Sequence, residues 1–348
     1  MQFNHLIEIG EKKISESSPV FIIGEAGVNH NGDMETAFQL IDAACTAGVD
    51  AVKFQTFRTD DLILKNMEKA PYQKKTTIPD QSQYEMLKAL ELSKENNKVL
   101  KEYCQKRGII FLSTPFEINS LAELVEMDIP AIKIAATDLT NIQFLKQAAS
   151  VKKPIFLSAG MCCLEEIKIA LNTICPVCKD VVLMQCTANY PVDDSEVNLN
   201  VIDTLKKEFD MIVGFSDHSK GVGASPFAVA KGACVIEKHF TLDRNAEGPD
   251  HMASVTLDEL KQLIEDIRRV ERYLGSGIKI PTYSEQFTKR SLQKYFVANS
   301  NIARGEKFTN ENIVAKRTNG KGISALYYET ILGHCAKRDY KKDEIIEE

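Results

Sequence analysis

The feature that most constrains the fold is a regular alternation of short apolar, β-rich runs with amphipathic segments. Between the runs, apolar residues recur with helical periodicity, for example in Met34–Gly48 and Ser82–Gly108. This alternation indicates a parallel sheet, and eight units predict a (β/α)8 TIM barrel, with an open doubly wound sheet as the alternative. The eight predicted strands are Val20–Gly27, Ala51–Phe57, Ile109–Phe116, Ala131–Asp138, Pro154–Gly160, Val181–Thr187, Ile212–His218 and Ala233–Phe240.

Segments at both ends extend the barrel. Residues 1–18 carry apolar pieces on either side of Gly10-Glu11, which predicts a hairpin that covers the barrel floor. The helical pattern Thr256–Leu274 ends at Gly275-Ser276-Gly277, which is typical of a helix C-cap followed by a linker. We therefore predict a barrel domain over residues 1–280, a linker over 281–289 and a small β-rich domain over 290–348.

Composition and charge exclude several classes of protein. Apolar residues make up 44% of the chain and charged residues 26%, as in soluble globular proteins, and no segment has the roughly 18 consecutive apolar residues of a membrane helix. The net charge of −6 argues against nucleic acid as the main partner. Nine scattered cysteines and the absence of a secretory signal at Met1–His5 indicate reduced thiols, so we expect a cytoplasmic protein with no membrane partner.

Polar and charged side chains recur at or near the C-terminal ends of all eight predicted strands. Such residues are unfavourable in a strand buried on both faces, and the active site of a (β/α)8 barrel lies at this end. The residues are Glu25, Lys53, Gln55, Ser113, Thr114, Lys133, Asp138, Ser158, Thr187, Ser216, Asp217, His218, Glu237, Lys238 and His239. A long polar loop, Arg58–Gln83, follows the second strand at the same face. The pattern predicts an active site at the barrel mouth.

Lys53 and Lys133 each lie inside an apolar strand, so both are expected to point into the barrel mouth. Two ammonium groups there would suit a small phosphorylated anion. Three hydroxyls from neighbouring strand ends would add donors: Thr114, Ser158 and Ser216. The alternative is that each lysine forms an ion pair with one of three carboxylates: Glu25, Asp138 or Glu237. For the set as a whole, we favour the anion.

His218 and His239 end the seventh and eighth strands, which are neighbours in a barrel. Two imidazoles from adjacent strand ends can share one divalent metal ion, with Glu25 or water completing the coordination. Nitrogen, carboxylate and water ligands suit Mn²⁺, Fe²⁺, Co²⁺ or Zn²⁺ better than Mg²⁺. The alternative is that each histidine is an ordinary hydrogen-bonded core residue.

Several ordered motifs resemble the sialic acid synthase family, and the resemblance runs nearly from end to end. In the barrel the motifs are Glu25–Gly32, Val52–Gln55, Ser113–Phe116, Ser216–His218, Glu237–Phe240 and Gly248–His251. The C-terminal segments resemble the antifreeze-like (SAF) domain of this family: Ile302–Glu306, Lys316-Arg317 and Gly322–Ser324. The resemblance implies a TIM barrel followed by a small β-rich SAF domain.

The resemblance also implies a reaction. Phosphoenolpyruvate would condense with the open-chain aldehyde of N-acetylmannosamine to give N-acetylneuraminate and phosphate. A divalent metal, Mn²⁺ or Mg²⁺, would lie on His218 and His239. Phosphoenolpyruvate contacts would fall on Lys53, Thr114, Lys133, Ser158 and Ser216, and sugar contacts on Gln55, Tyr190 and Asp250. Glu25 and Asp138 are the candidates for proton transfer.

The resemblance further implies a homodimer with a domain-swapped SAF lid. The SAF domain of one subunit would cover the barrel mouth of the other and supply Arg317. From Lys289 to Glu348 the chain has 12 basic and 8 acidic residues, a net charge of +4 that leaves −10 for the rest. This basic segment is either a solvated surface or, as the lid implies, a source of a cation for an anionic site.

The sequence departs from the family pattern in its fourth strand, where Ala136 replaces a serine and Asp138 replaces a glutamate. An alternative enzyme is therefore considered, an N,N'-diacetyllegionaminate synthase that uses 2,4-diacetamido-2,4,6-trideoxymannose. We expect two parts of the chain to determine whether the enzyme accepts a sugar with a C6 hydroxyl or one with a C6 methyl group: the loop Lys69–Thr77 and Tyr190. A hypothesis of another class is a sugar-binding or scaffold protein without catalytic activity. The joint presence of five polar strand residues argues against it: Glu25, Lys53, Lys133, His218 and His239.

Overall fold

The computed structural model describes residues 1–70, 73–77 and 80–347. The chain divides into two compact units, Met1–Gly275 and Ser276–Glu348, which are described separately below. Parts of the polar loop Arg58–Gln83, at 71–72 and 78–79, lie outside the described residues.

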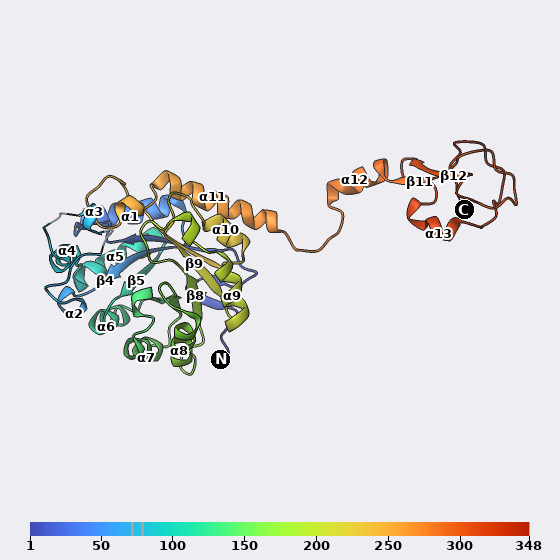
Figure 1. Cartoon of the computed structure of the whole chain (residues 1–348). Helices are drawn as coiled ribbons and strands as arrows, with labels where there is room; N and C mark the ends of the chain where they lie inside the picture. Colours follow the sequence, from blue (N-terminus) through green and yellow to red (C-terminus); the bar gives the residue numbers. More distant parts are fainter. Residues whose placement is uncertain (71–72, 78–79, 348) are drawn as a thin grey trace. The chain divides into compact units, whose positions relative to one another are not determined.

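The first unit is a (β/α)8 barrel, as predicted (Figure 1). Its eight strands are parallel and pair in the order β5-β4-β3-β10-β9-β8-β7-β6. The end strands β5 and β6 lie in contact, which closes the sheet and rules out the open doubly wound alternative. The strands are β3 (Phe21–Gly27), β4 (Ala51–Thr56), β5 (Ile110–Pro115), β6 (Ile132–Ile134), β7 (Ile155–Ser158), β8 (Val181–Gln185), β9 (Val213–Asp217) and β10 (Val235–His239). Each falls within one of the predicted runs, although β6 is shorter because Ala136–Asp138 forms a 3₁₀ turn.

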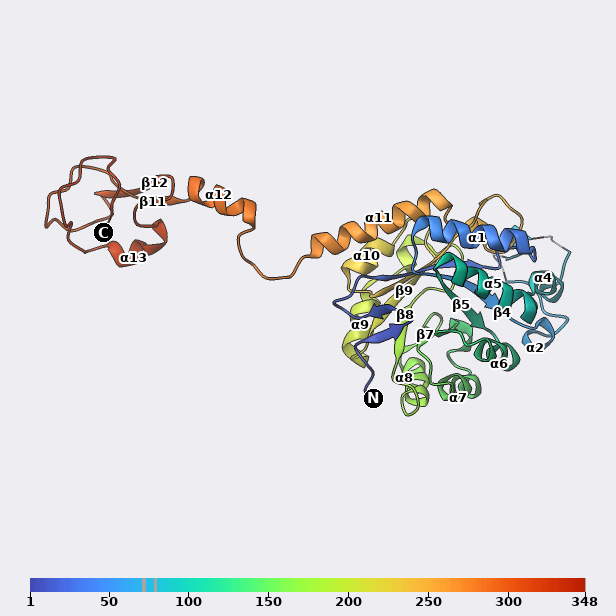
Figure 2. The same cartoon turned by 180° about the vertical axis from the view of Figure 1, so that it is seen from behind.

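Helices surround this sheet, and the main hydrophobic core lies between the two layers. Figure 2 shows α11, α1 and α5 side by side along one side of the barrel. The helices that follow strands are α1 (Met34–Ala47), α5 (Lys94–Arg107), α6 (Ile118–Glu126), α7 (Ile142–Ser150), α8 (Leu164–Ile174), α9 (Asn200–Phe209), α10 (Ser225–Ala230) and α11 (Leu257–Leu274). Within the described residues, we find no helix with the length and apolar character needed to traverse a lipid bilayer.

The segment between β4 and α5 differs from the predicted pattern. Its described residues contain three short helices: α2 (Thr59–Leu62), α3 (Gln73–Thr76) and α4 (Gln83–Leu90). The amphipathic stretch Ser82–Gly108 is therefore two helices, α4 and α5. The break arises because Ser93 accepts a hydrogen bond from the backbone N–H of Asn96 and caps a new helix. The described parts of the polar loop thus include two short helices, α2 and α3, and α4 begins at its end.

The N-terminal hairpin is present as predicted, with strands β1 (Ile7–Ile9) and β2 (Lys12–Ile14). Three isoleucines of this hairpin, Ile7, Ile9 and Ile14, join a second hydrophobic cluster inside the barrel. Their partners there include Phe21 and Phe156, whose rings stack with centroids 6.0 Å apart. The hairpin therefore plugs the barrel floor with apolar side chains and keeps water out from that end.

The second unit is small and built around its own core, which includes Phe296, Phe308 and Tyr340. Its regular elements are α12 (Tyr283–Leu292), β11 (Lys294–Ala298), β12 (Ile313–Arg317) and α13 (Tyr328–Ile331). β11 and β12 are antiparallel, and isolated β-bridges connect the other segments of this unit to them and to one another. The predicted linker 281–289 overlaps α12, and the units divide between Gly275 and Ser276. The helix forms because Thr282 and Glu285 make a capping box.

Candidate active site

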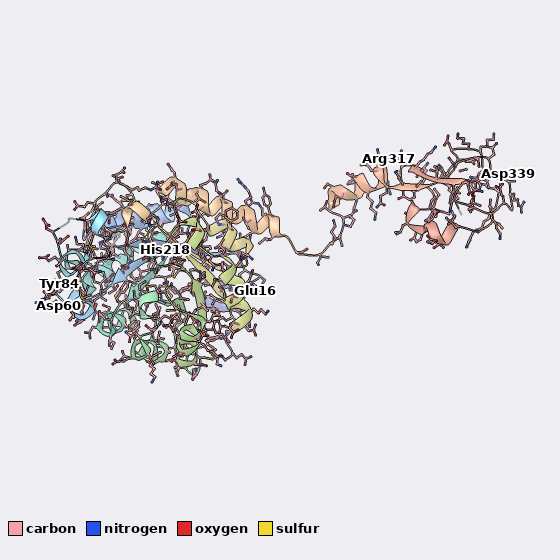
Figure 3. All side chains as sticks on the ribbon, in the orientation of Figure 1. Glu16, Asp60, Tyr84, His218, Arg317 and Asp339 are labelled. Atoms are coloured by element: carbon pink, nitrogen blue, oxygen red, sulfur yellow. The ribbon has the colours of Figure 1, made fainter. Side chains whose placement is uncertain are left out.

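A cavity of ≈ 940 Å³ opens at the C-terminal ends of the barrel strands. Every predicted site residue of the barrel lines it: Glu25, Lys53, Gln55, Thr114, Lys133, Asp138, Ser158, Tyr190, Ser216, His218, His239 and Asp250. Figure 3 labels His218 in this unit and Arg317, the remaining predicted residue, in the C-terminal unit. The barrel alone therefore assembles the predicted site except for Arg317.

The floor of the cavity is a cluster of buried charges around Lys53. The Nζ atom of Lys53 lies 2.6 Å from Oε2 of Glu25 and 3.7 Å from Oε1 of Glu237. It also donates a hydrogen bond of 2.9 Å to Oγ1 of Thr114. The ion pair with Glu25, which the sequence analysis weighed as an alternative to an anion site, is thus present.

Lys133 also lies near the Glu237 carboxylate. Its Nζ atom donates to Oγ of Ser158 at 2.7 Å and lies 3.8 Å from Oε1 of Glu237. Ser216 donates to that same oxygen at 3.2 Å. Glu237 therefore joins both lysines, whereas the sequence indicated it only as a possible ion-pair partner of one lysine. The signal for its wider role is strand alternation, which puts Glu237 on the same face of β10 as His239.

The floor combines two buried lysines with two buried carboxylates, and burial shifts their pKa values. Burial raises the pKa of Glu25 to about 7, and the neighbouring Glu237 charge adds to this effect while Lys53 opposes it. Burial also acts to raise the pKa of Glu237, but Lys133 and Lys53 outweigh it and the net direction is downward. Burial lowers the pKa of Lys133, and the nearby Lys53 charge adds to this effect while Glu237 opposes it. With Glu25 protonated and both lysines charged, the floor would carry one net positive charge.

The two histidines lie together above this floor, with ring centroids 5.7 Å apart. Nδ1 of His218 donates to the carbonyl oxygen of Thr187 at 2.7 Å, so its Nε2 keeps a lone pair. Nδ1 of His239 is buried and has no hydrogen-bond partner among the described residues. Burial lowers the pKa of both imidazoles, which favours the neutral form that binds metals.

These features fit a metal ion held by two imidazoles with open coordination positions. An unpaired buried nitrogen beside a second imidazole is a suitable donor set for a transition-metal ion. Across residues 1–70, 73–77 and 80–347, no group of three or more His, Cys, Asp or Glu residues has a metal-binding arrangement. Whether Glu25 or water would complete the coordination stays a prediction.

The predicted sugar contacts surround the imidazoles. The ring of Tyr190 lies 4.1 Å from that of His218 and 5.5 Å from that of His239, measured between centroids. Oδ2 of Asp250 lies 3.9 Å from Nδ1 of His239, and burial raises the pKa of Asp250 to about 6. Gln55 donates to Oε1 of Glu25 at 3.2 Å. The polar groups thus converge on one side of the cavity.

Asp138 lies on the opposite wall, in the 3₁₀ turn Ala136–Asp138. It accepts hydrogen bonds from Thr137 at 3.1 Å and Asn141 at 3.2 Å, and burial raises its pKa. The hydroxyl of Thr137 is directed to Asp138 and so orients the carboxylate next to Ala136, where the family pattern has a serine.

A second buried ion pair lies behind the histidines, on the outer face of the sheet. Lys238 and Asp217 are register partners on β10 and β9, and each adjoins a histidine in sequence. Nζ of Lys238 lies 3.2 Å from Oδ2 of Asp217 and donates to the carbonyl of Ser219 at 2.6 Å. Asp217 also accepts from Ser219 and from Ser225 at the start of α10. This network fixes the strand ends that carry both imidazoles.

We expect Lys238→Met to destabilise the barrel by about 3–5 kcal/mol, because it leaves the Asp217 carboxylate buried without its cation. The double variant Lys238→Met/Asp217→Asn removes both charges and should unfold at a higher temperature than the single variant. Thermal denaturation of the two variants and the wild type checks this. A single variant as stable as the wild type would contradict the role given to the pair.

The fold and cavity define a (β/α)8 barrel whose cavity is lined by two buried lysines, two buried carboxylates and a pair of imidazoles. Comparison with known families agrees: residues 40–279 match the NeuB family and residues 293–348 match the SAF domain. The chain belongs to the NeuB family.

Individual relatives cover nearly the whole chain. An N,N'-diacetyllegionaminic acid synthase of Campylobacter jejuni is 46% identical over 94% of this chain and 98% of its own length. Another, from Legionella pneumophila, is 42% identical over 93% of this chain and 92% of its own length. A crystal structure of N-acetylneuraminic acid synthetase from Leptospira borgpetersenii in complex with citrate has a TM-score of 0.74 and 35% identity, covering 82% of this chain and 95% of that one.

Proposed function

We propose that this protein is a nonulosonic acid synthase that condenses phosphoenolpyruvate with the open-chain aldehyde of an N-acylated hexosamine. The observation that carries the proposal is that Lys53 and Lys133 both approach Glu237 in the cavity that the paired imidazoles also line. One cavity thus offers cations for an enol phosphate and a polar rim for a sugar aldehyde. The new C–C bond joins C3 of phosphoenolpyruvate to the aldehyde carbon, water adds at C2, and phosphate leaves.

The lysines would hold phosphoenolpyruvate at the cavity floor. Its phosphate and carboxylate are anionic, and charge-assisted hydrogen bonds from buried ammonium groups are strong. The nearby hydroxyls of Thr114, Ser158 and Ser216 can add further donors once the anion competes for their present partners. Because the hairpin plugs the floor with apolar residues, these interactions act in a poorly solvated site.

His218 and His239 would hold a divalent ion, Mn²⁺ or Mg²⁺. When bound there, such an ion supplies Lewis-acid polarisation of the sugar aldehyde oxygen. Glu25, with a pKa of about 7, can give and take a proton near neutral pH. Asp138 is the second carboxyl group for proton transfer, since burial also raises its pKa. Together they can protonate the aldehyde oxygen and activate the attacking water.

We infer that the sugar is 2,4-diacetamido-2,4,6-trideoxymannose, which would make the protein an N,N'-diacetyllegionaminate synthase. Support comes from the two full-length legionaminic acid synthase relatives, at 46% and 42% identity. N-acetylmannosamine, the first expectation from the sequence, is the second candidate, because the Leptospira N-acetylneuraminic acid synthetase is 35% identical.

The cavity lining also favours a sugar without a phosphate group. Among the described lining residues, the only cationic side chains are Lys53 and Lys133, at the floor. Apart from Glu25 and Glu237 at the floor, the acidic side chains of the described lining are Asp61, Glu117, Asp138 and Asp250. A sugar phosphate would bring its dianion towards these carboxylates and be repelled.

Phosphate release from phosphoenolpyruvate, measured with a panel of sugars, tests the proposal. We expect the highest kcat/KM with 2,4-diacetamido-2,4,6-trideoxymannose, a lower value with N-acetylmannosamine, and the lowest with N-acetylmannosamine 6-phosphate. Higher kcat/KM with N-acetylmannosamine would select the second candidate.

The same assay with a chelator tests the metal. Turnover should stop on chelation and return with Mn²⁺, whereas His5→Ala, at an exposed histidine remote from the cavity, should respond as the wild type does. No turnover with any sugar and metal would leave the silent sugar-binding or scaffold protein as the remaining reading.

We further propose a homodimer in which the SAF domain of one subunit covers the barrel mouth of the other. Arg317 would then reach the sugar or phosphoenolpyruvate from the partner subunit. Its position at the end of β12 with an exposed side chain is compatible with this role. The acidic outer lining of the cavity would complement the positive charge of the C-terminal unit.

We expect Arg317→Ala to lower kcat/KM by about 100-fold or more, because a charge-assisted contact to the substrate is lost. The variant should keep the thermal stability of the wild type, since the side chain is exposed. Arg304→Ala, at another exposed arginine of the same unit, is the matched control and should leave the kinetics unchanged. Equal kinetics for the two variants would contradict the lid.

A further inference from the structure

We propose that an apolar wall at the cavity mouth selects the sugar substrate. The wall favours a hexose with a methyl group at C6 in place of a hydroxymethyl group, and with an acetamido group at C4. The wall consists of Phe57, Leu62, Leu87 and Phe116, which line the cavity and pack with Val28, Met86 and Leu90 in a separate hydrophobic cluster. The inference rests on the proposed function and assigns residues that choose its sugar.

The wall continues directly from the charged floor. Side chains two residues apart along a strand point to the same face, so Lys53, Gln55 and Phe57 form a rising row along β4 and just past its end. Thr114 and Phe116 form the corresponding row at β5. The two phenylalanine rings meet edge to face, with centroids 6.2 Å apart. A sugar whose aldehyde lies at the imidazoles can therefore extend its other end along this wall.

The inserted helices hold the wall in place. Leu62 lies at the end of α2 and Leu87 in the middle of α4. The two helices are tied together by a 2.5 Å hydrogen bond from Tyr84 to Asp60, which are labelled side by side in Figure 3. Glu91 accepts hydrogen bonds from both the backbone and the hydroxyl of Thr59 at the start of α2. The apolar side chains are thus presented by fixed helices.

The chemistry of the wall discriminates between the candidate sugars. A hydroxymethyl group placed against it would lose its hydrogen bonds to water without gaining a partner. A methyl at C6 and the methyl of an acetamido group at C4 would instead bury apolar surface. Gln83 lies one helical turn before Leu87 on the same face of α4 and lines the cavity, where it can meet the polar part of that acetamido group.

Two variants replace leucine with a polar residue of similar size, Leu62→Asn and Leu87→Gln. The ratio of kcat/KM for 2,4-diacetamido-2,4,6-trideoxymannose over that for N-acetylmannosamine should fall by about 10-fold or more, since a methyl in an apolar pocket is worth roughly 10–200-fold. The KM for phosphoenolpyruvate should stay within about 2-fold of the wild-type value, because the wall lies away from the floor.

The matched control is Leu64→Asn, at a leucine that is 76% exposed and outside the described lining. It should keep the wild-type ratio, and Leu87→Met, which stays apolar, should keep most of it. In one outcome, the wild-type enzyme prefers the diacetamido sugar and both polar variants keep its kcat/KM ratio for the two sugars. That result would contradict the role given to the apolar wall and would leave the proposed function unaffected. A wild-type enzyme inactive with every sugar would overturn the proposed function and the wall together.

Discussion

The site depends on the buried Glu237 carboxylate, one oxygen of which lies near two buried lysines. Glu237 is 3.7 Å from Lys53 and 3.8 Å from Lys133, and these side chains are almost completely buried. Burying one ammonium group is costly, and burying two next to each other is worse, because their charges repel. The Glu237 carboxylate offsets that repulsion and allows both ammonium groups to lie near the same oxygen atom, Oε1. Together with Glu25, which lies 2.6 Å from Lys53, it allows two cations to lie at the floor of a cavity.

The remainder of the barrel maintains this arrangement. The N-terminal hairpin seals the floor with isoleucines, so the charged cluster is shielded from water on that side. On the outer face of the sheet, the Lys238–Asp217 pair fixes the ends of β9 and β10, from which both imidazoles project. The hydrogen bond from His218 to Thr187 sets which ring nitrogen keeps a lone pair. Separate sets of contacts therefore position the buried lysines and carboxylates, the two imidazoles, and the ends of β9 and β10 around one cavity.

Most of the barrel could be predicted from the sequence, because runs such as Val181–Thr187 are apolar on both faces and interrupted by helical periodicity. The barrel site could be predicted for the same reason, since Lys53 and Lys133 stand out in buried strands. What escaped prediction depends on contacts between segments. Glu237 seemed a simple partner for a lysine, yet it joins two lysines from different strands. The helices α4 and α12 begin at local caps, at Ser82 and Thr282, within stretches whose composition resembled a longer helix and a linker. The apolar wall could not be predicted from the sequence, because Leu62 and Leu87 are separated from each other by a stretch that is polar on average.

The most direct test of the central claim is the binding of phosphoenolpyruvate measured by isothermal titration calorimetry, without a sugar present. The account predicts that Lys133→Met weakens binding by about 100-fold or more, because a charge-assisted contact in a buried site is lost. Lys179→Met, at an exposed lysine outside the described cavity lining, should bind as the wild type does. Equal affinity in the wild type and in Lys133→Met would show that the two lysines do not form the anion site, and the account would be contradicted.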